Sequence, residues 1–181
     1  MKGLIILVNN FEDVEALATV DVLRRSGIII DTTSLDNKDI ITQSNNKITV
    51  DYLLSEVNLN EYDFLILPGG KAVFNILDKD KRIDDLVDYF YVNKKLICAI
   101  CAAPRLIAKR GYFDNLKFTI FPGCLETEVL GKQVSKGVVV EDYFITAKSM
   151  YYSIEFALEI IKKLQGKDQK KKIENQIKGK K

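Results

Sequence analysis

The sequence predicts an α/β domain in which helices cover a mostly parallel central sheet. Short, continuously apolar runs recur along the chain, as is typical of strands buried on both faces. Segments with helical spacing of apolar residues alternate with these runs, which indicates strand–helix–strand units. The chain has 181 residues, of which 47% are hydrophobic and 29% charged, so it fits one globular domain and not a disordered protein.

The first half of the chain carries three predicted strands and one helix. Leu4–Val8 is an uninterrupted apolar run and predicts the first strand. Glu12–Arg25 has apolar residues over one broad face and predicts a helix that stops at Gly27. Ile28–Ser34 and Phe64–Leu67 predict the next two strands.

The second half repeats the alternation. Ile83–Tyr91 predicts a helix, Leu96–Ile100 a buried strand, and Pro104–Arg110 a helix closed by Gly111. The remaining predicted elements are strands near Phe118–Ile120, Val138–Val140 and Tyr143–Ala147, followed by an amphipathic helix, Ser153–Leu164.

Residues 1–164 are expected to form a single domain, and residues 165–181 a Lys-rich C-terminal helix or tail. This segment holds seven lysines against Asp168 and Glu174, a net charge of +5, whereas the whole chain carries +2. Such a segment could bind nucleic acid or another acidic surface. No aromatic residue is interleaved to stack on a base, which favours a solvated terminal helix docked through Ile173 and Ile177. We therefore expect no nucleic-acid partner.

The composition excludes several kinds of site. The chain has no histidine, so Ser–His and Cys–His catalytic pairs and imidazole-bound zinc are absent. Its three cysteines are too few for a disulfide framework or a four-thiolate zinc site, and the odd count suits a reducing compartment. No apolar run is long enough to span a membrane, and the N-terminal run lacks the cleavage region of a signal peptide. We therefore expect a cytoplasmic protein with no metal site and no membrane partner.

Three predicted loops lie where open α/β sheets bind ligands, beyond the carboxyl ends of the strands. The first strand leads to Glu12-Asp13-Val14-Glu15, and the Phe64–Leu67 strand leads to Pro68-Gly69-Gly70. The Leu96–Ile100 strand leads to Cys101-Ala102-Ala103-Pro104. A carboxylate, a glycine turn and a cysteine are therefore expected to converge on one rim of the sheet.

Cys101 lies between a buried strand and a helix, the arrangement of a nucleophile elbow. The N–H groups and the dipole at the helix start are expected to lower the pKa of its thiol. The alternative is a buried structural cysteine, and the spacing alone does not separate the two. Cys98 completes a Cys-x-x-Cys pair but points away from the rim, which disfavours a thioredoxin-like dithiol. Cys124 is expected near the rim, as an unreactive loop residue or a resolving thiol.

The acidic cluster offers three candidate carboxyl groups. Helical geometry places Glu12 and Glu15 on one face and Asp13 elsewhere. Glu12 lies at the helix start, whereas Glu15 lies about one turn deeper, where burial would raise its pKa. Each carboxylate can also serve only helix-start electrostatics. The glycine pair allows close approach of a ligand to backbone N–H groups, but it is too short for a nucleotide-binding loop.

In combination these motifs resemble the ThiJ/PfpI superfamily, in the clade of the parkinsonism-associated protein DJ-one. The resemblance runs from about Leu4 to Leu164 and implies a flavodoxin-like three-layer sandwich and a homodimer. The matching residues are Glu12-Asp13-Val14-Glu15, Val20-Asp21-Val22-Leu23-Arg24-Arg25-Ser26-Gly27, Leu67-Pro68-Gly69-Gly70, Ala99-Ile100-Cys101-Ala102-Ala103-Pro104 and Glu155-Phe156-Ala157-Leu158.

The resemblance also implies residue roles. Cys101 would be the reactive cysteine, and Glu15 the protonated carboxyl group that hydrogen-bonds it. Gly69, Gly70 and Ala102 would supply backbone N–H groups around a bound oxygen.

Two positions depart from the family. The histidine that relatives often place beside the cysteine is matched here by Phe121, and the late turn that often reads Gly-Pro-Gly is Ser149-Met150-Tyr151-Tyr152. The protease-like branch has histidine directly after the cysteine, whereas this chain has Ala102. A Cys–His peptidase is therefore excluded.

The function implied by the resemblance is that of a cysteine-dependent enzyme without a cofactor that acts on reactive carbonyls. It would be a glutathione-independent glyoxalase (lyase) converting methylglyoxal to lactate, or a deglycase. Its partners would be a small reactive aldehyde or a glycated substrate. The alternative is a redox-sensing or chaperone-like stress protein whose Cys101 is oxidised rather than catalytic. The same thiol serves both functions, so the residues leave them open.

Overall fold

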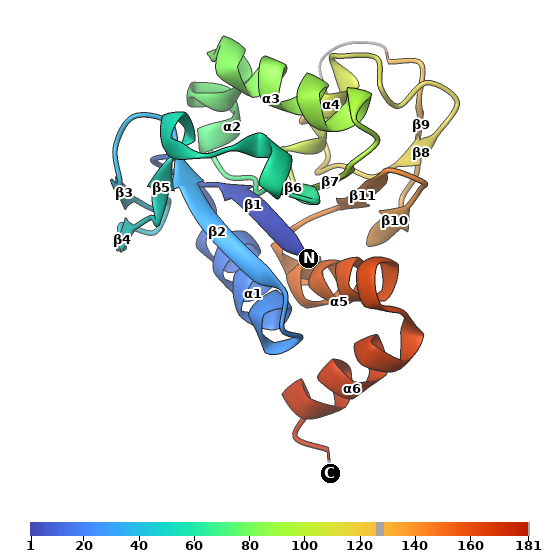
Figure 1. Ribbon diagram of the computed structural model, residues 1–181. Coiled ribbons are helices and arrows are strands. Elements are labelled where there is room, and N and C mark those ends of the chain that lie inside the picture. Colours follow the sequence, from blue (N-terminus) through green and yellow to red (C-terminus); the bar gives the residue numbers. More distant parts are fainter. Residues whose placement is uncertain (126–128, 181) are drawn as a thin grey trace.

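A seven-stranded sheet forms the centre of the computed structural model, which describes residues 1–125 and 129–180 (Figure 1). The strand order is β10-β11-β7-β6-β1-β2-β5. Only β10 is antiparallel to its neighbour, and every other pair is parallel, which confirms the predicted mostly parallel sheet. The strands are β1 (Lys2–Ile6), β2 (Ile29–Ser34), β5 (Tyr52–Leu53), β6 (Phe64–Leu67), β7 (Leu96–Ile100), β10 (Val138–Val140) and β11 (Phe144–Ala147).

Helices cover both faces of the sheet, as predicted. On one face α1 (Asp13–Arg25) packs against α5 (Ser153–Gln165). The opposite face carries α3 (Lys81–Val92), α4 (Pro104–Ala108) and the short α2 (Ala72–Asn75) (Figure 1). Each helix buries one apolar face against the sheet, so the chain is a three-layer α/β sandwich.

The central strands set the position of the functional loops. All residues of β6 and β7 are buried, as expected for strands covered on both faces. Their parallel register pairs Leu67 with Ala99, and β1 pairs Ile5 with Ile66 on the other side of β6. The loops after β1, β6 and β7 therefore leave the sheet at the same edge, where the sequence predicts the rim.

Several short elements depart from the sequence prediction. A hairpin of β3 (Asp39–Ile41) and β4 (Lys47–Thr49) was not predicted, because its strands have only three residues each. The strand expected at Phe118–Ile120 is wrong as a member of the central sheet. Instead β8 (Lys117–Phe118) pairs with β9 (Lys132–Gln133) in a separate small sheet. The chain then leaves the strand, and the amide of Thr119 donates to the hydroxyl of Thr146.

The remaining differences concern short helical elements. Helix α4 ends at Ala108, two residues earlier than predicted, and the chain after it forms turns. The 3₁₀ turns are η1 (Leu54–Glu56), η2 (Leu59–Glu61), η3 (Leu77–Lys79) and η4 (Met150–Tyr152).

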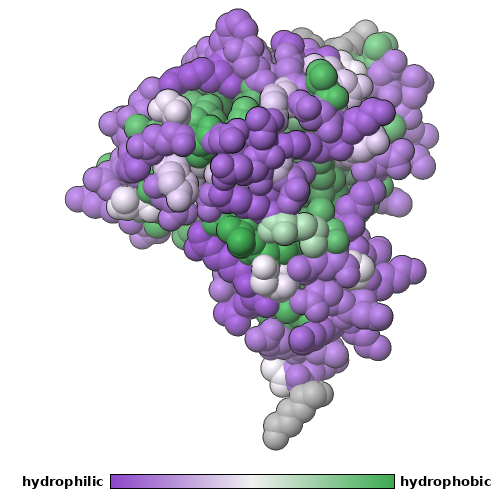
Figure 2. Space-filling model, viewed as in Figure 1, coloured by the Kyte–Doolittle hydropathy of each residue, from purple (hydrophilic) through white to green (hydrophobic). Residues whose placement is uncertain are grey.

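The Lys-rich segment forms helix α6 (Lys167–Ile177), which packs on α5 at the far end of the molecule from α3 and α4 (Figure 1). Ile173 is buried, and Lys170 pairs with Glu159 of α5 at 2.6 Å. Lys181 lies outside the described residues. Figure 2 shows a mostly hydrophilic surface in this view, with apolar residues gathered across the middle of the molecule. Within residues 1–125 and 129–180, no helix is long and apolar enough to cross a membrane.

Candidate active site

Cys101 forms a sharp elbow directly after β7. Its φ is +63°, a left-handed conformation that costs a non-glycine residue about 1–2 kcal/mol. Two hydrogen bonds hold this conformation: the Cys101 amide donates to the carbonyl of Ala147 at 2.9 Å, and its carbonyl accepts from the amide of Phe121 at 2.9 Å. The fold therefore imposes the turn that presents the half-buried Cys101 side chain at the end of the sheet.

Glu15 reaches the same place from the first turn of α1. Only 1% of its surface is exposed, and its Oε2 accepts a hydrogen bond from the Gly69 amide at 2.8 Å. Its Oε1 has no hydrogen-bond partner among the described residues. Burial raises the pKa of Glu15 to about 7, and contacts with Cys101 and Gly69 offset part of that effect. Glu15 is thus a carboxyl group that can hold a proton near neutral pH.

The other two carboxylates of the cluster are engaged elsewhere. Glu12 caps α1, because its Oε2 accepts from the amide of Glu15 at 2.9 Å. Asp13 turns toward the β3–β4 hairpin, where it accepts from the Ser44 amide at 3.2 Å and the Asn46 side chain at 2.8 Å. Of the three, Glu15 is the one that the structure brings together with Cys101.

The two glycines after β6, Gly69 and Gly70, have different structural roles in the site. A Cβ atom added to Gly69 would lie 2.6 Å from Glu15 Oε2 and 2.7 Å from Cys101 Cβ, so only glycine fits between these side chains. Gly70 has a φ of +92° and lines the site cavity. The Gly69 amide donates to Glu15 and so positions the carboxyl group, and a contact of Gly69 with a substrate oxygen stays a prediction.

The pKa of the Cys101 thiol differs from the sequence prediction. Burial, followed by the charge of Glu15, raises this pKa above its ordinary value, and the Ala102 amide, which donates to the sulfur, acts in the opposite direction. The expected lowering by a helix dipole is wrong, because α4 has only 5 residues and cannot outweigh burial. Because an ionised Glu15 raises the pKa of Cys101, the thiolate forms more readily while Glu15 holds a proton.

A cavity of about 280 Å³ opens beside this pair. Its walls combine apolar and polar side chains with the backbone of the elbow. The lining residues are Glu12, Glu15, Gln43, Gly70, Lys71, Phe74, Cys101, Ala102, Phe121, Cys124, Ser149 and Met150. Cys98 lies instead in the core, in agreement with its predicted direction away from the rim.

Sequence reasoning missed three residues of the cavity. Gln43 comes from the β3–β4 turn, and its Oε1 accepts from the Lys71 amide at 2.9 Å. Lys71 directly follows the glycine pair, so its position in the turn was a signal that could have been used. Gln43 carried no comparable signal, because the distant β3–β4 turn brings it to the site, whereas Phe74 lies in α2, four residues after Gly70.

Comparison with known proteins matches residues 1–163 to the DJ-1/PfpI family. The chain belongs to the DJ-1/PfpI family. Protein dj-1beta of Drosophila melanogaster is 31% identical over 170 residues, which cover 92% of this chain and 91% of the relative. The crystal structure of Drosophila DJ-1beta has a TM-score of 0.89 at 29% identity, covering 97% of this chain and 96% of that one. Oxidised DJ-1 of Toxoplasma gondii has a TM-score of 0.90 at 27% identity, with 97% of both chains covered.

Membership of the DJ-1/PfpI family confirms the resemblance carried by the Cys101 motif. Phe121, at the place where the sequence predicts a departure, lines the cavity and is 44% exposed. Ser149 and Met150, from the second departing segment, line it as well. Among the described residues of this DJ-1/PfpI chain, no three His, Cys, Asp or Glu side chains cluster to hold a metal ion.

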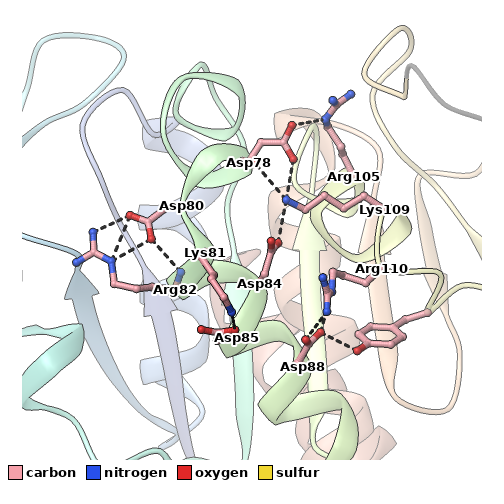
Figure 3. A network of polar contacts seen from close by, with 11 residues as sticks. Asp78, Asp80, Lys81, Arg82, Asp84, Asp85, Asp88, Arg105, Lys109 and Arg110 are labelled. Carbon is pink, nitrogen blue, oxygen red and sulfur yellow. Dashed lines mark hydrogen bonds and ion pairs between the residues drawn. The ribbon is translucent and has the colours of Figure 1, made fainter.

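Ion pairs hold the helix after the elbow of this DJ-1/PfpI chain in place (Figure 3). Asp78 of η3 pairs with Arg105 at 2.9 Å and with Lys109 at 3.0 Å. Lys109 also pairs with Asp84 of α3 at 2.9 Å. Because α4 begins three residues after Cys101, these contacts stabilise the position of the elbow against η3 and α3.

Proposed function

We propose that this chain is a cysteine-dependent enzyme that acts on reactive carbonyls without a cofactor, converting methylglyoxal to lactate, or acting as a related deglycase. The observation that carries the proposal is one cavity lined by a cysteine, a buried carboxyl group with a raised pKa, and the backbone of Gly70 and Ala102. Perturbed titratable groups in a cavity are typical of acid–base and nucleophilic sites.

The first step uses the Cys101 thiolate as nucleophile. Its sulfur adds to the aldehyde carbon of methylglyoxal, so an S–C bond forms and the aldehyde oxygen becomes an oxyanion. The Ala102 amide lies at the sulfur, and Gly70 lies at the cavity wall. Backbone N–H groups at these positions would stabilise the oxyanion. Glu15 holds the proton that the thiol has lost and returns it to this oxygen, which gives a hemithioacetal.

The second step moves a proton between adjacent carbons. Ionised Glu15 removes the C–H proton of the hemithioacetal carbon and returns it to the neighbouring carbon. The hydroxyl proton of the hemithioacetal passes to the former ketone oxygen, and the adduct becomes a lactoyl thioester. Water then breaks the S–C bond and releases lactate and the thiol of Cys101. A pKa of about 7 suits Glu15 to both protonation states that this cycle needs.

The cavity supports a small substrate. Its volume of about 280 Å³ lies near the lower end of ligand sites, which span about 300–1,000 Å³. Phe74, Phe121 and Met150 supply apolar surface to the cavity wall. Lys71 and Gln43 supply polar groups that could orient the second carbonyl oxygen.

The experiment that tests the proposal is an assay of purified protein for methylglyoxal loss with matching lactate formation. We expect turnover in the wild type and in Glu12→Gln, and none in Cys101→Ser. Turnover that survives in Cys101→Ser would show that another group carries the reaction. A wild type that consumes no methylglyoxal and no glycated substrate would leave the redox-sensing role as the function of Cys101.

A further inference from the structure

A second thiol, Cys124, lines the cavity that contains Cys101 and Glu15. Both cysteines are half-buried, whereas Cys98 lies fully in the core. Glu15, which is 1% exposed, lines the same cavity. The carbonyl chemistry proposed above uses Cys101 and Glu15 and assigns no role to Cys124.

Backbone contacts tie Cys124 to the elbow. The Phe121 amide donates to the Cys101 carbonyl at 2.9 Å, and the Cys124 amide donates to the Phe121 carbonyl at 3.2 Å. From the other side, the Arg105 guanidinium donates to the Cys124 carbonyl at 3.4 Å. Arg105 is in turn held by Asp78 at 2.9 Å (Figure 3). Hydrogen bonds therefore hold the turn that carries Cys124 both to Cys101 and to Arg105 of helix α4.

The electrostatics of the two thiols are coupled. Both cysteines line one cavity, and a negative charge on Cys124 raises the pKa of Cys101. Burial raises the pKa of Cys124, and the positive charge of Arg105 offsets part of that rise. The pKa of both thiols is therefore raised, and the two differ in that Cys101 lies beside Glu15, a carboxyl group that can accept its proton.

We propose that Cys124 is the resolving cysteine of Cys101 in a hydroperoxide-driven reaction. The Cys101 thiolate attacks the terminal oxygen of the hydroperoxide, so an S–O bond forms and the O–O bond breaks. The sulfur is oxidised by two electrons, and the peroxide is reduced to an alcohol, or to water, that takes its proton from Glu15. Cys124 then attacks the sulfenic sulfur: the S–S bond forms, the S–O bond breaks, and the hydroxyl group leaves as water with the Cys124 proton.

This reaction gives the site a reversible oxidised state. A Cys101–Cys124 disulfide stops further oxidation of Cys101 to sulfinic acid, which ordinary thiols do not reverse. It also removes the nucleophile from the cavity until a dithiol reduces it. The inference does not depend on carbonyl turnover, because it concerns only the thiols and an oxidant.

The test is to treat the full-length protein with one equivalent of hydrogen peroxide and to analyse it by mass spectrometry. We expect a protein lighter by two hydrogen atoms, with tryptic peptides 96–105 and 118–132 joined, and full recovery of free thiols with dithiothreitol. Tandem fragmentation distinguishes Cys101 from Cys98 within peptide 96–105, and Cys98→Ala is expected to form the same link. In Cys124→Ser the joined peptides disappear, and Cys101 gains oxygen atoms that dithiothreitol removes only in part.

Three results would overturn the inference. One is a sulfinic acid on Cys101 with a free Cys124 thiol in the wild type. Another is a disulfide that uses Cys98. The third is a protein whose thiols all remain free under excess peroxide. A disulfide requires the two Cα atoms to approach within about 7 Å, so the first result would show that the turn does not bring Cys124 to the oxidised Cys101.

Discussion

The Gly69 amide donates a hydrogen bond of 2.8 Å to Glu15 Oε2, and this bond joins the turn after β6 to a buried acid of α1. Cys101 Cβ lies next to the same glycine, since a Cβ at Gly69 would meet both Cys101 Cβ and Glu15 Oε2. Three loops of the sheet edge therefore meet at one residue without a side chain.

Gly69→Ala is expected to impair the site while the fold persists. The added Cβ would lie 2.6 Å from Glu15 Oε2 and 2.7 Å from Cys101 Cβ, so one of these groups must move. A displacement of about 1 Å can cost about 100-fold in turnover, and we expect a loss of that order in the methylglyoxal assay. Gly27→Ala is the control: its Cβ meets nothing within 4 Å, and its positive φ affects only stability. Normal turnover in Gly69→Ala would refute the close packing.

Glu15→Gln is expected to change how stability depends on pH. The native pKa of Glu15 is about 7 against an ordinary value of 4.5, so the folded state binds more protons than the unfolded state between these values. The free energy of unfolding of the wild type therefore falls by about 3 kcal/mol as the pH rises through this window. The variant lacks this contribution. Urea unfolding at about pH 5 and about pH 8 measures it, and an equal fall in both proteins would contradict the burial of an ionisable Glu15.

Asp78→Ala tests the ion pairs that hold α4 (Figure 3). The Asp78 and Arg105 side chains are each only 17% exposed, so removing this carboxylate is expected to lower the free energy of unfolding by about 1–3 kcal/mol. The matched control is Asp85→Ala, which breaks an exposed pair with Lys81 and should cost under about 1 kcal/mol. Urea unfolding compares the two variants. Equal losses would show that burial of the Asp78 pair has no energetic consequence.

We propose that the chain forms a homodimer, and light scattering at micromolar concentration tests this. Val14 and Leu17 on α1 and Ile41 on β3 are exposed apolar residues, and Asp13 of α1 accepts hydrogen bonds from the turn that follows β3. Such a surface favours a protein partner, and Leu17→Lys should shift the dimer toward monomer. A wild-type species of 20.6 kDa would contradict the proposal.

The main layers of the fold follow from the sequence because their signals are local. The apolar runs of β6 and β7 and the periodicity of α3 and α5 each fix an element without reference to distant residues. The β3–β4 hairpin was not predicted, because its local sequence signal is weak and distant contacts hold it in place. Its strands are short and half exposed, and contacts such as the Asn46–Asp13 hydrogen bond hold them to α1.

In the candidate site, too, local features could be predicted from the sequence and features that depend on distant residues could not. The strand–turn–helix pattern placed Cys101, and helical spacing separated Glu15 from Asp13. The pKa of Cys101 could not be predicted, because it depends on the burial of the elbow and on the charge of Glu15 from another element. The part played by Gly69 depends on a hydrogen bond between residues 54 positions apart, for which the sequence carries no signal.

The sharing of one proton between Glu15 and Cys101 is tested most directly by the rate of Cys101 alkylation as a function of pH, read from tryptic peptide 96–105. The wild type and Glu12→Gln are expected to show a step in rate near pH 7, where the pair loses its first proton. In Glu15→Gln this step should disappear, and the rate should rise only at the higher pH where a buried thiol ionises alone. A step near pH 7 that persists in Glu15→Gln would contradict the account.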